Sequence, residues 1–127
     1  MTNAPRYRLG LVAALMACGQ ATAAPDYKSL SGDWDSNFGP VHIDLVSAKK
    51  PAGSARVRGF WMETKTHRGE IESGSYDAST GDLEFDYLET WSKVHGHARL
   101  KFDGKGVSGT FKSENGDTGI WTWKRKH

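Results

Sequence analysis

The sequence has 127 residues, with 17 basic and 15 acidic side chains and a single cysteine, Cys18. A chain of this length forms one domain, and one cysteine excludes an internal disulfide, a redox pair and a thiolate metal site. Because Arg6 and Arg8 precede the predicted domain, residues 24–127 carry 15 basic and 15 acidic side chains. This balance gives no clustered basic surface, so we expect no nucleic-acid partner.

The first 23 residues have the pattern of a cleavable export signal. Arg6 and Arg8 precede an apolar run from Leu9 to Cys18, and small residues follow at 21–24. A charged start, an apolar middle and a small-residue cleavage site are typical of secretory signals. The apolar run is too short for a transmembrane helix, which takes about 20 residues. We therefore expect an exported, periplasmic or extracellular protein with a signal over 1–23 and one domain over 24–127.

Two cleavage sites compete in this segment. Ala21-Thr22-Ala23 fits the small-x-small pattern and would release a soluble chain that begins at Ala24. The segment from Ala14 to Cys18 instead resembles a bacterial lipoprotein box, in which Cys18 is acylated and becomes the new N-terminus. In that case the protein is an outer-membrane lipoprotein with a lipid anchor as its membrane tether. The sequence leaves both alternatives open.

After residue 24, short runs of alternating apolar and polar residues are separated by clusters of Gly, Asp, Asn, Ser and Lys. This is the pattern of antiparallel strands joined by tight turns. We predict eight strands, near 31–36, 41–46, 56–63, 69–76, 83–87, 94–102, 107–112 and 119–124. The clearest turn signals are 77–81, 103–106 and 114–117, where glycines supply the positive φ that tight turns require.

Eight such strands bury their apolar faces as an all-β, antiparallel up-and-down meander barrel, which also removes open sheet edges. A barrel of this size either fills with side chains or holds one small ligand. Alternation directs large aromatic residues inward, and we expect these to line a ligand-binding interior: Trp61, Phe85, Tyr87, Phe111 and Trp121. Smaller residues are predicted to share the interior, leaving a cavity or fitting the taper of a packed barrel: Gly59, Ser73, Ala98 and Gly109.

The opening of the domain, Leu30-Ser-Gly-Asp-Trp34, resembles the Gly-x-Trp signature of the calycin group. That group includes lipocalins, avidins and small bacterial metalloprotease inhibitors. The resemblance implies a barrel in which Gly32 and Trp34 open the first strand and Trp34 closes one end. It also implies a basic side chain of the last strand over the indole, a role for Lys124 or Arg125. Such cation–π contacts contribute about 0.5–2 kcal/mol.

Two calycin families imply different activities. The segment 32–39 is similar to the opening of the avidins, but Ser36 and Pro40 stand where that family has an Asn that contacts biotin and a hydroxyl residue. The resemblance therefore implies a barrel rather than biotin binding. The metalloprotease inhibitors share the Leu-Ser-Gly-x-Trp opening and the secreted setting, although they usually carry a disulfide that this chain lacks.

His95 and His97 are the sharpest chemical candidates, because residues two apart on a strand lie on the same face. Glu84 and Asp86 of the preceding strand should share that face. If the four side chains converge, a metal site with two histidines and a carboxylate is possible. The alternative is ordinary cross-strand charge pairing on a solvated face.

Catalytic motifs are lacking: the sequence has no Gly-x-Ser-x-Gly elbow, phosphate loop or His-Glu-x-x-His helix. We therefore expect a binding protein that is not an enzyme and has no cofactor. The leading hypothesis is a barrel that holds a small apolar or amphipathic ligand. The alternative is a protein-interaction module or an inhibitor of an envelope or secreted hydrolase. A well-formed cavity would favour the first, and an exposed aromatic patch near Trp91 or Phe38 would favour the second.

Overall fold

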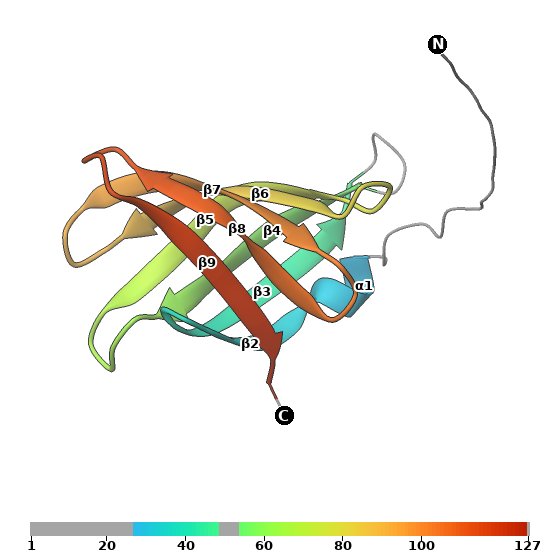
Figure 1. The fold of residues 1–127 in the computed structure, drawn as a ribbon, viewed down its shortest axis with the longest axis horizontal. Helices are drawn as coiled ribbons and strands as arrows, with labels where there is room; N and C mark the ends of the chain where they lie inside the picture. Colours follow the sequence, from blue (N-terminus) through green and yellow to red (C-terminus); the bar gives the residue numbers. More distant parts are fainter. Residues whose placement is uncertain (1–26, 49–53, 127) are drawn as a thin grey trace, which may run out of the picture.

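The computed structural model describes residues 27–48 and 54–126, which form one short helix and a barrel of eight strands (Figure 1). The elements are α1 Tyr27–Leu30, β2 Gly32–Ser36, β3 Gly39–Ser47, β4 Ser54–Met62, β5 Arg68–Asp77, β6 Asp82–Glu89, β7 Val94–Phe102, β8 Gly106–Ser113 and β9 Thr118–Arg125. Each strand pairs antiparallel with the next, and β2 pairs with β9. The predicted eight-stranded antiparallel up-and-down barrel is confirmed. The predicted signal, both cleavage sites and Cys18 lie outside the described residues.

Local sequence explains the strands and the turns between them. In β6, Leu83, Phe85 and Tyr87 are buried and the residues between them are more exposed, as the alternation predicts. The turn after β7 forms because the Asp103 carboxylate accepts the backbone N–H groups of Lys105 and Gly106, both at 2.8 Å. Side chains that bond their own backbone in this way stabilise tight turns.

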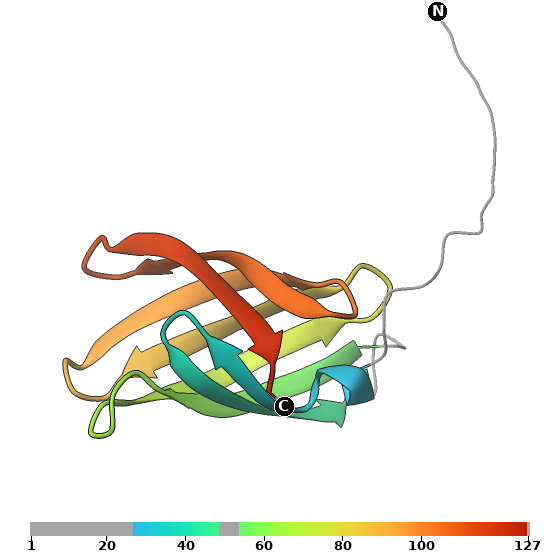
Figure 2. The ribbon, with the colours of Figure 1, turned by 60° about the horizontal axis from the view of Figure 1, so that its bottom comes forward.

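The strands curve round into a closed barrel (Figure 2). Its core is a column of aromatic rings. Trp34 packs edge-on against Phe102, with ring centroids 5.8 Å apart. Trp121 continues the column, with centroids 5.7 Å from both Trp123 and Phe85. Each fully buried aromatic side chain contributes about 1.5–3 kcal/mol of transfer free energy. A core of this kind can hold the fold together without a disulfide.

A β-bulge in β5 changes which residues face inward. Ile71 pairs with Tyr87 but Ser73 pairs with Asp86, so β5 contains one extra residue. An extra residue moves the following side chains to the opposite face of the sheet. Ser73 is consequently exposed, whereas Tyr76 is fully buried. The prediction that Ser73 lies in the barrel interior is therefore wrong.

One end of the barrel, here called the closed end, is sealed by α1, Trp34 and Arg125. The Trp34 indole N–H donates to the carbonyl of Leu30, at 2.9 Å. The Arg125 guanidinium lies 3.9 Å from the Trp34 ring centroid and donates to the carbonyl of Ser31 at 3.3 Å. Of the two basic residues proposed for this contact, Arg125 makes it, and Lys124 is exposed.

Gly32 leads the chain from α1 into β2. Its φ is +120°, a conformation that favours glycine because a Cβ would be strained there. A Cβ at this position would also lie 3.6 Å from Nη1 of Arg125. The Gly-x-Trp opening therefore serves the closed end through both of its signature residues.

The seam between β2 and β9 completes the barrel. Trp34, Asp35 and Ser36 pair with residues of β9, and the Asn37 side chain continues this ladder. Its amide donates to the carbonyl of Ile120 at 2.8 Å and accepts the Thr122 N–H at 2.9 Å. The Asn37 backbone N–H also donates to the Thr122 carbonyl at 3.2 Å, so the backbone and the side chain of Asn37 together extend the seam past the end of β2.

Candidate ligand-binding site

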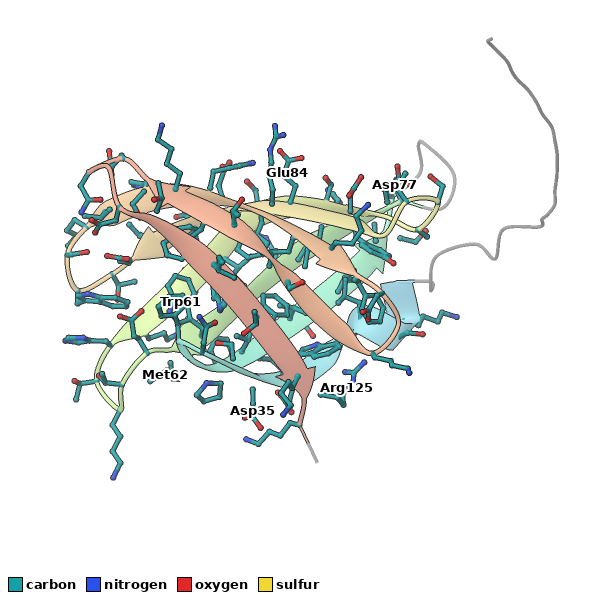
Figure 3. All side chains as sticks on the ribbon, viewed as in Figure 1. Asp35, Trp61, Met62, Asp77, Glu84 and Arg125 are labelled. Atoms are coloured by element: carbon teal, nitrogen blue, oxygen red, sulfur yellow. The ribbon has the colours of Figure 1, made fainter. Side chains whose placement is uncertain are left out.

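The barrel end opposite α1 opens into a cavity of about 350 Å³, here called the mouth pocket. Small-molecule sites typically occupy about 300–1,000 Å³. Figure 3 shows Trp61 toward this end and Arg125 toward the closed end. The residues that line the mouth pocket are Phe38, Trp61, Glu63, Tyr87, Glu89, Phe111, Ser113, Asp117, Thr118, Gly119 and Trp121.

Three aromatic rings of the mouth pocket each pack over a glycine on the neighbouring strand. The cross-strand pairs are Trp61 with Gly69, Tyr87 with Gly96 and Phe111 with Gly119. A Cβ on these glycines would lie 2.3, 2.2 and 2.8 Å from the respective rings. The rings therefore lie close against the barrel wall in space that only glycine leaves free. This packing helps to keep the mouth of the barrel open.

A hydrogen-bonded hydroxyl pair lies inside the pocket. The oxygens of Tyr87 and Ser113 are 2.7 Å apart, and both side chains are buried. Burial raises the pKa of the Tyr87 hydroxyl, and the charges of Glu89, Asp117 and Glu63 raise it further, while the bond from Ser113 opposes this. The phenol is thus neutral at ordinary pH and able to donate or accept a hydrogen bond.

Two indole groups of the pocket differ in their hydrogen bonding. The Trp61 N–H donates to the Glu63 carboxylate at 3.3 Å. The Trp121 N–H is buried and has no acceptor among the described residues. The Trp123 N–H, which lies outside the mouth pocket, is buried without an acceptor among the described residues in the same way, so this feature does not distinguish the pocket.

Trp91 lies at the edge of the mouth and packs on the outside of Trp61. Its ring centroid is 6.3 Å from that of Trp61, and it stacks on His67 at 4.8 Å with the rings 9° from parallel. The side chain is half-buried against the core and does not line the mouth pocket. Trp91 therefore packs against the side of Trp61 that faces away from the pocket.

The structure brings together four of the five aromatic residues that the sequence analysis assigned to the interior. Trp61, Tyr87, Phe111 and Trp121 all line the mouth pocket. Phe85 faces the interior too, but it is enclosed deeper in the barrel between Trp121 and Trp123 and is not part of the lining.

Phe38 is the one aromatic residue of the pocket that was not predicted from the sequence, and the other lining residues not predicted are Glu63, Glu89, Ser113, Asp117, Thr118 and Gly119. Phe38 lies in the turn between β2 and β3, where no strand alternation indicates the direction of its side chain. Its ring contacts Phe111 edge-on at 5.4 Å and Trp121 at 6.1 Å. Its position next to the Gly-x-Trp strand is the one signal that could have placed it at the mouth.

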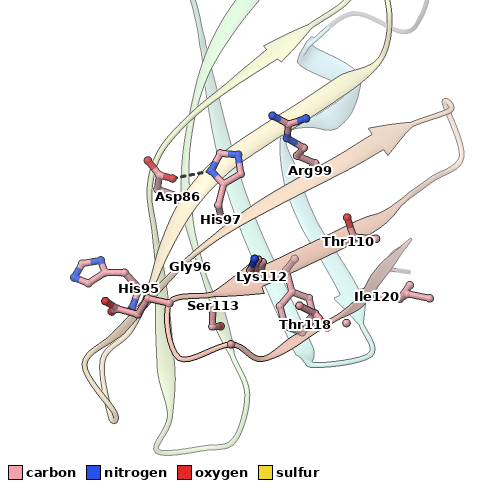
Figure 4. A pocket seen from close by; sticks show the side chains of 14 residues that line it. Asp86, His95, Gly96, His97, Arg99, Thr110, Lys112, Ser113, Thr118 and Ile120 are labelled. Carbon is pink, nitrogen blue, oxygen red and sulfur yellow. Dashed lines mark hydrogen bonds and ion pairs between the residues drawn. The ribbon is translucent and has the colours of Figure 1, made fainter.

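The histidines and carboxylates proposed as a metal site lie on the outer face of the barrel, but His95 does not join His97 and Asp86 (Figure 4). His97 is bracketed by Asp86 at Nδ1 and Glu84 at Nε2, both at 2.7 Å. His95 instead approaches Glu72 at 3.5 Å. Within residues 27–48 and 54–126, no group of three or more His, Cys, Asp or Glu side chains is placed to hold a metal ion. The arrangement is that of cross-strand charge pairs.

The hydrogen bond to Asp86 is the main cause that raises the pKa of His97, and Glu84 adds to it. A second cluster of the same kind surrounds His42, which approaches Asp33 at 2.8 Å and Asp44 at 3.2 Å. The bond to Asp33 is again the main cause that raises the pKa of His42. Both clusters stabilise the protonated imidazole.

The comparisons with known proteins return no relative: no family model, curated protein or solved structure matches this chain. Among the described residues, no helix has the length and apolar character needed to cross a membrane. The geometry of the mouth pocket is therefore the basis on which a function can be assigned.

Proposed function

We propose that this chain is an exported, non-enzymatic binding protein whose calycin-like barrel holds a small apolar or amphipathic ligand in the mouth pocket. The observation that carries the proposal is an aromatic cavity of about 350 Å³ at one barrel end, while the other end is sealed. Sites of this kind combine apolar walls with a few converging polar groups. Here the polar groups are the paired hydroxyls of Tyr87 and Ser113.

The alternative of a protein-interaction module calls for an exposed aromatic patch on the loops. Phe38 and Trp91, the two residues on which that alternative depends, are partly buried and pack against the core. Within residues 27–48 and 54–126, the exposed large hydrophobic side chains are Val46 and Ile120, which belong to different strands that do not pair with each other. The small-ligand proposal therefore has the stronger support.

Binding can be tested with N-phenyl-1-naphthylamine, an uncharged dye whose fluorescence rises in apolar surroundings. We expect a saturable rise with the wild-type protein. Phe111→Ala should weaken the affinity roughly two- to tenfold, because an aromatic contact contributes about 0.5–1.5 kcal/mol. Ile120→Ala is the matched control, because Ile120 is 62% exposed and lies outside the mouth pocket. No saturable signal, or equal effects of the two variants, would contradict the proposal.

The export part of the proposal rests on the sequence of residues 1–23 and has its own test. Intact-mass measurement of the protein from its native cells should give either a chain that begins at Ala24 or a diacylated chain that begins at Cys18. Either mass supports export, and the second adds a lipid anchor. A mass that matches the whole chain from Met1 would contradict export through this signal.

A further inference from the structure

Negative charge surrounds the mouth pocket, and no described cation neutralises it. The lining includes the carboxylates of Glu63, Glu89 and Asp117 and, among the described residues, no Lys, Arg or His. None of these three carboxylates forms an ion pair with a basic side chain of the described part of the chain. Several carboxylates of the outer wall do form such pairs: Asp82, for example, pairs with Lys101 at 3.0 Å.

Neutral donors position two of these carboxylates at the pocket. Glu63 accepts the Trp61 indole N–H, and Glu89 accepts the Ser92 hydroxyl at 2.8 Å. Such bonds orient a carboxylate without cancelling its charge. The charges of all three also act on the Tyr87 hydroxyl inside the pocket, so their field reaches the space that a ligand would occupy.

The aromatic walls favour the same sign of charge. The faces of Trp, Tyr and Phe rings carry partial negative charge and attract cations. An anionic ligand would meet repulsion from both the carboxylates and the ring faces.

We propose that the ligand of the mouth pocket is a small organic cation, an ammonium group on an apolar body. The apolar body lies among Trp61, Phe111 and Trp121, and the ammonium group lies at the rim among Glu63, Glu89 and Asp117. This inference rests on the proposed function and specifies the chemical class of its ligand.

A series of three probes of similar size tests the sign of the charge: 2-phenylethylamine, 2-phenylethanol and 3-phenylpropionate. Calorimetric titration at pH 7.5 and low salt should rank the affinities cation, neutral, anion. We expect the amine to bind about tenfold more tightly than the alcohol, since partly shielded charges produce a preference of this size. Added salt should reduce the preference, because it screens charges at the rim.

Charge-neutral variants locate the source of the preference. In Glu63→Gln/Glu89→Gln/Asp117→Asn, the remaining carbonyl oxygens still accept hydrogen bonds, and the amine should lose about tenfold in affinity while the alcohol is unchanged. The matched control is Asp35→Asn/Asp44→Asn/Glu72→Gln, which removes three exposed carboxylates that do not line the mouth pocket. The control should keep the preference for the amine.

The outcomes separate this inference from the function on which it rests. If the naphthylamine dye binds but the amine binds no better than the alcohol or the acid, the cation proposal is overturned and the binding function stands. The same conclusion follows if both triple variants lose the preference equally. If neither the dye nor any of the three probes binds, the proposed function itself fails.

Discussion

Within the mouth pocket, the hydroxyls of Tyr87 and Ser113 satisfy each other at 2.7 Å, and both side chains are buried. Tyr87→Phe leaves the Ser113 hydroxyl without its protein partner, so we expect the free energy of unfolding to fall by about 1–3 kcal/mol. Urea denaturation measures this. The double variant Tyr87→Phe/Ser113→Ala removes both partners and should recover part of the loss. If the double variant lost as much free energy of unfolding as Tyr87→Phe and Ser113→Ala lose separately, added together, this account would be contradicted.

His97 on the outer wall predicts a pH-dependent contribution to stability. Because the Asp86 and Glu84 carboxylates raise its pKa in the folded protein, its stabilising contribution is complete below the unfolded pKa of about 6.5. The contribution is lost as pH rises through the higher folded pKa. His97→Gln should therefore cost more stability at pH 6 than at pH 9, by roughly 0.2–1 kcal/mol for these exposed cross-strand pairs.

Denaturant unfolding of wild type and His97→Gln at both pH values checks this difference. An NMR titration of the His97 ring should independently give a midpoint above 6.5, its ordinary value. A cost that is equal at the two pH values, or larger at pH 9, would show that the carboxylates do not stabilise the imidazolium.

For the strands, the pairing of aromatic residues with glycines is the feature with the clearest consequence. Gly96→Ala places a Cβ 2.2 Å from the Tyr87 ring, so the ring must move into the mouth pocket. Overpacking of this kind costs about 1–3 kcal/mol, and the displaced ring should also weaken dye binding. Ser108→Ala is the control, because Ser108 is an exposed strand residue on β8. Unchanged dye affinity in Gly96→Ala would disprove the role given to this pair.

Much of this strand-level organisation is visible in the sequence. Alternation in β6 and the Asp103–Gly106 turn depend on neighbouring residues alone, and both were predicted. The bulge in β5 was not predicted. It adds one residue that turns Ser73 outward, and the amino-acid composition of the strand does not indicate it. Nor was α1 predicted, since four residues carry no helical periodicity; the chain holds them through the bond from Trp34 to Leu30.

The sequence predicted most of the aromatic residues that face the candidate site but not how they pack against neighbouring strands. Alternation placed Trp61 and Tyr87 inside, whereas their packing over Gly69 and Gly96 depends on the register between strands. The depth of Phe85 likewise depends on its contacts with rings of β9, far away in the sequence. These contacts form only when the strands pair and the barrel closes, so the sequence of one strand alone does not predict them.

Across the whole barrel, the proposed function gives the two ends separate roles, with the closed end stabilising the fold and the mouth holding the ligand. Arg125→Ala removes the cation over Trp34 and a hydrogen bond to Ser31. We expect a loss of about 1–3 kcal/mol in the free energy of unfolding. Affinity for the naphthylamine dye should stay within about twofold, a change well under 1 kcal/mol. A large loss of dye affinity in a variant that is still folded would contradict the separation of the two ends.

The most direct test of the central claim is a ¹H–¹⁵N NMR spectrum of the tryptophan indole N–H groups during titration with N-phenyl-1-naphthylamine. Trp61 and Trp121 line the mouth pocket, whereas the Trp34 N–H is bonded to Leu30 at the closed end. We predict that the indole signals of Trp61 and Trp121 shift as the dye binds and that the Trp34 signal stays in place. Shifts confined to Trp34, or saturating dye fluorescence with no shift at Trp61 or Trp121, would place the ligand elsewhere and contradict the account.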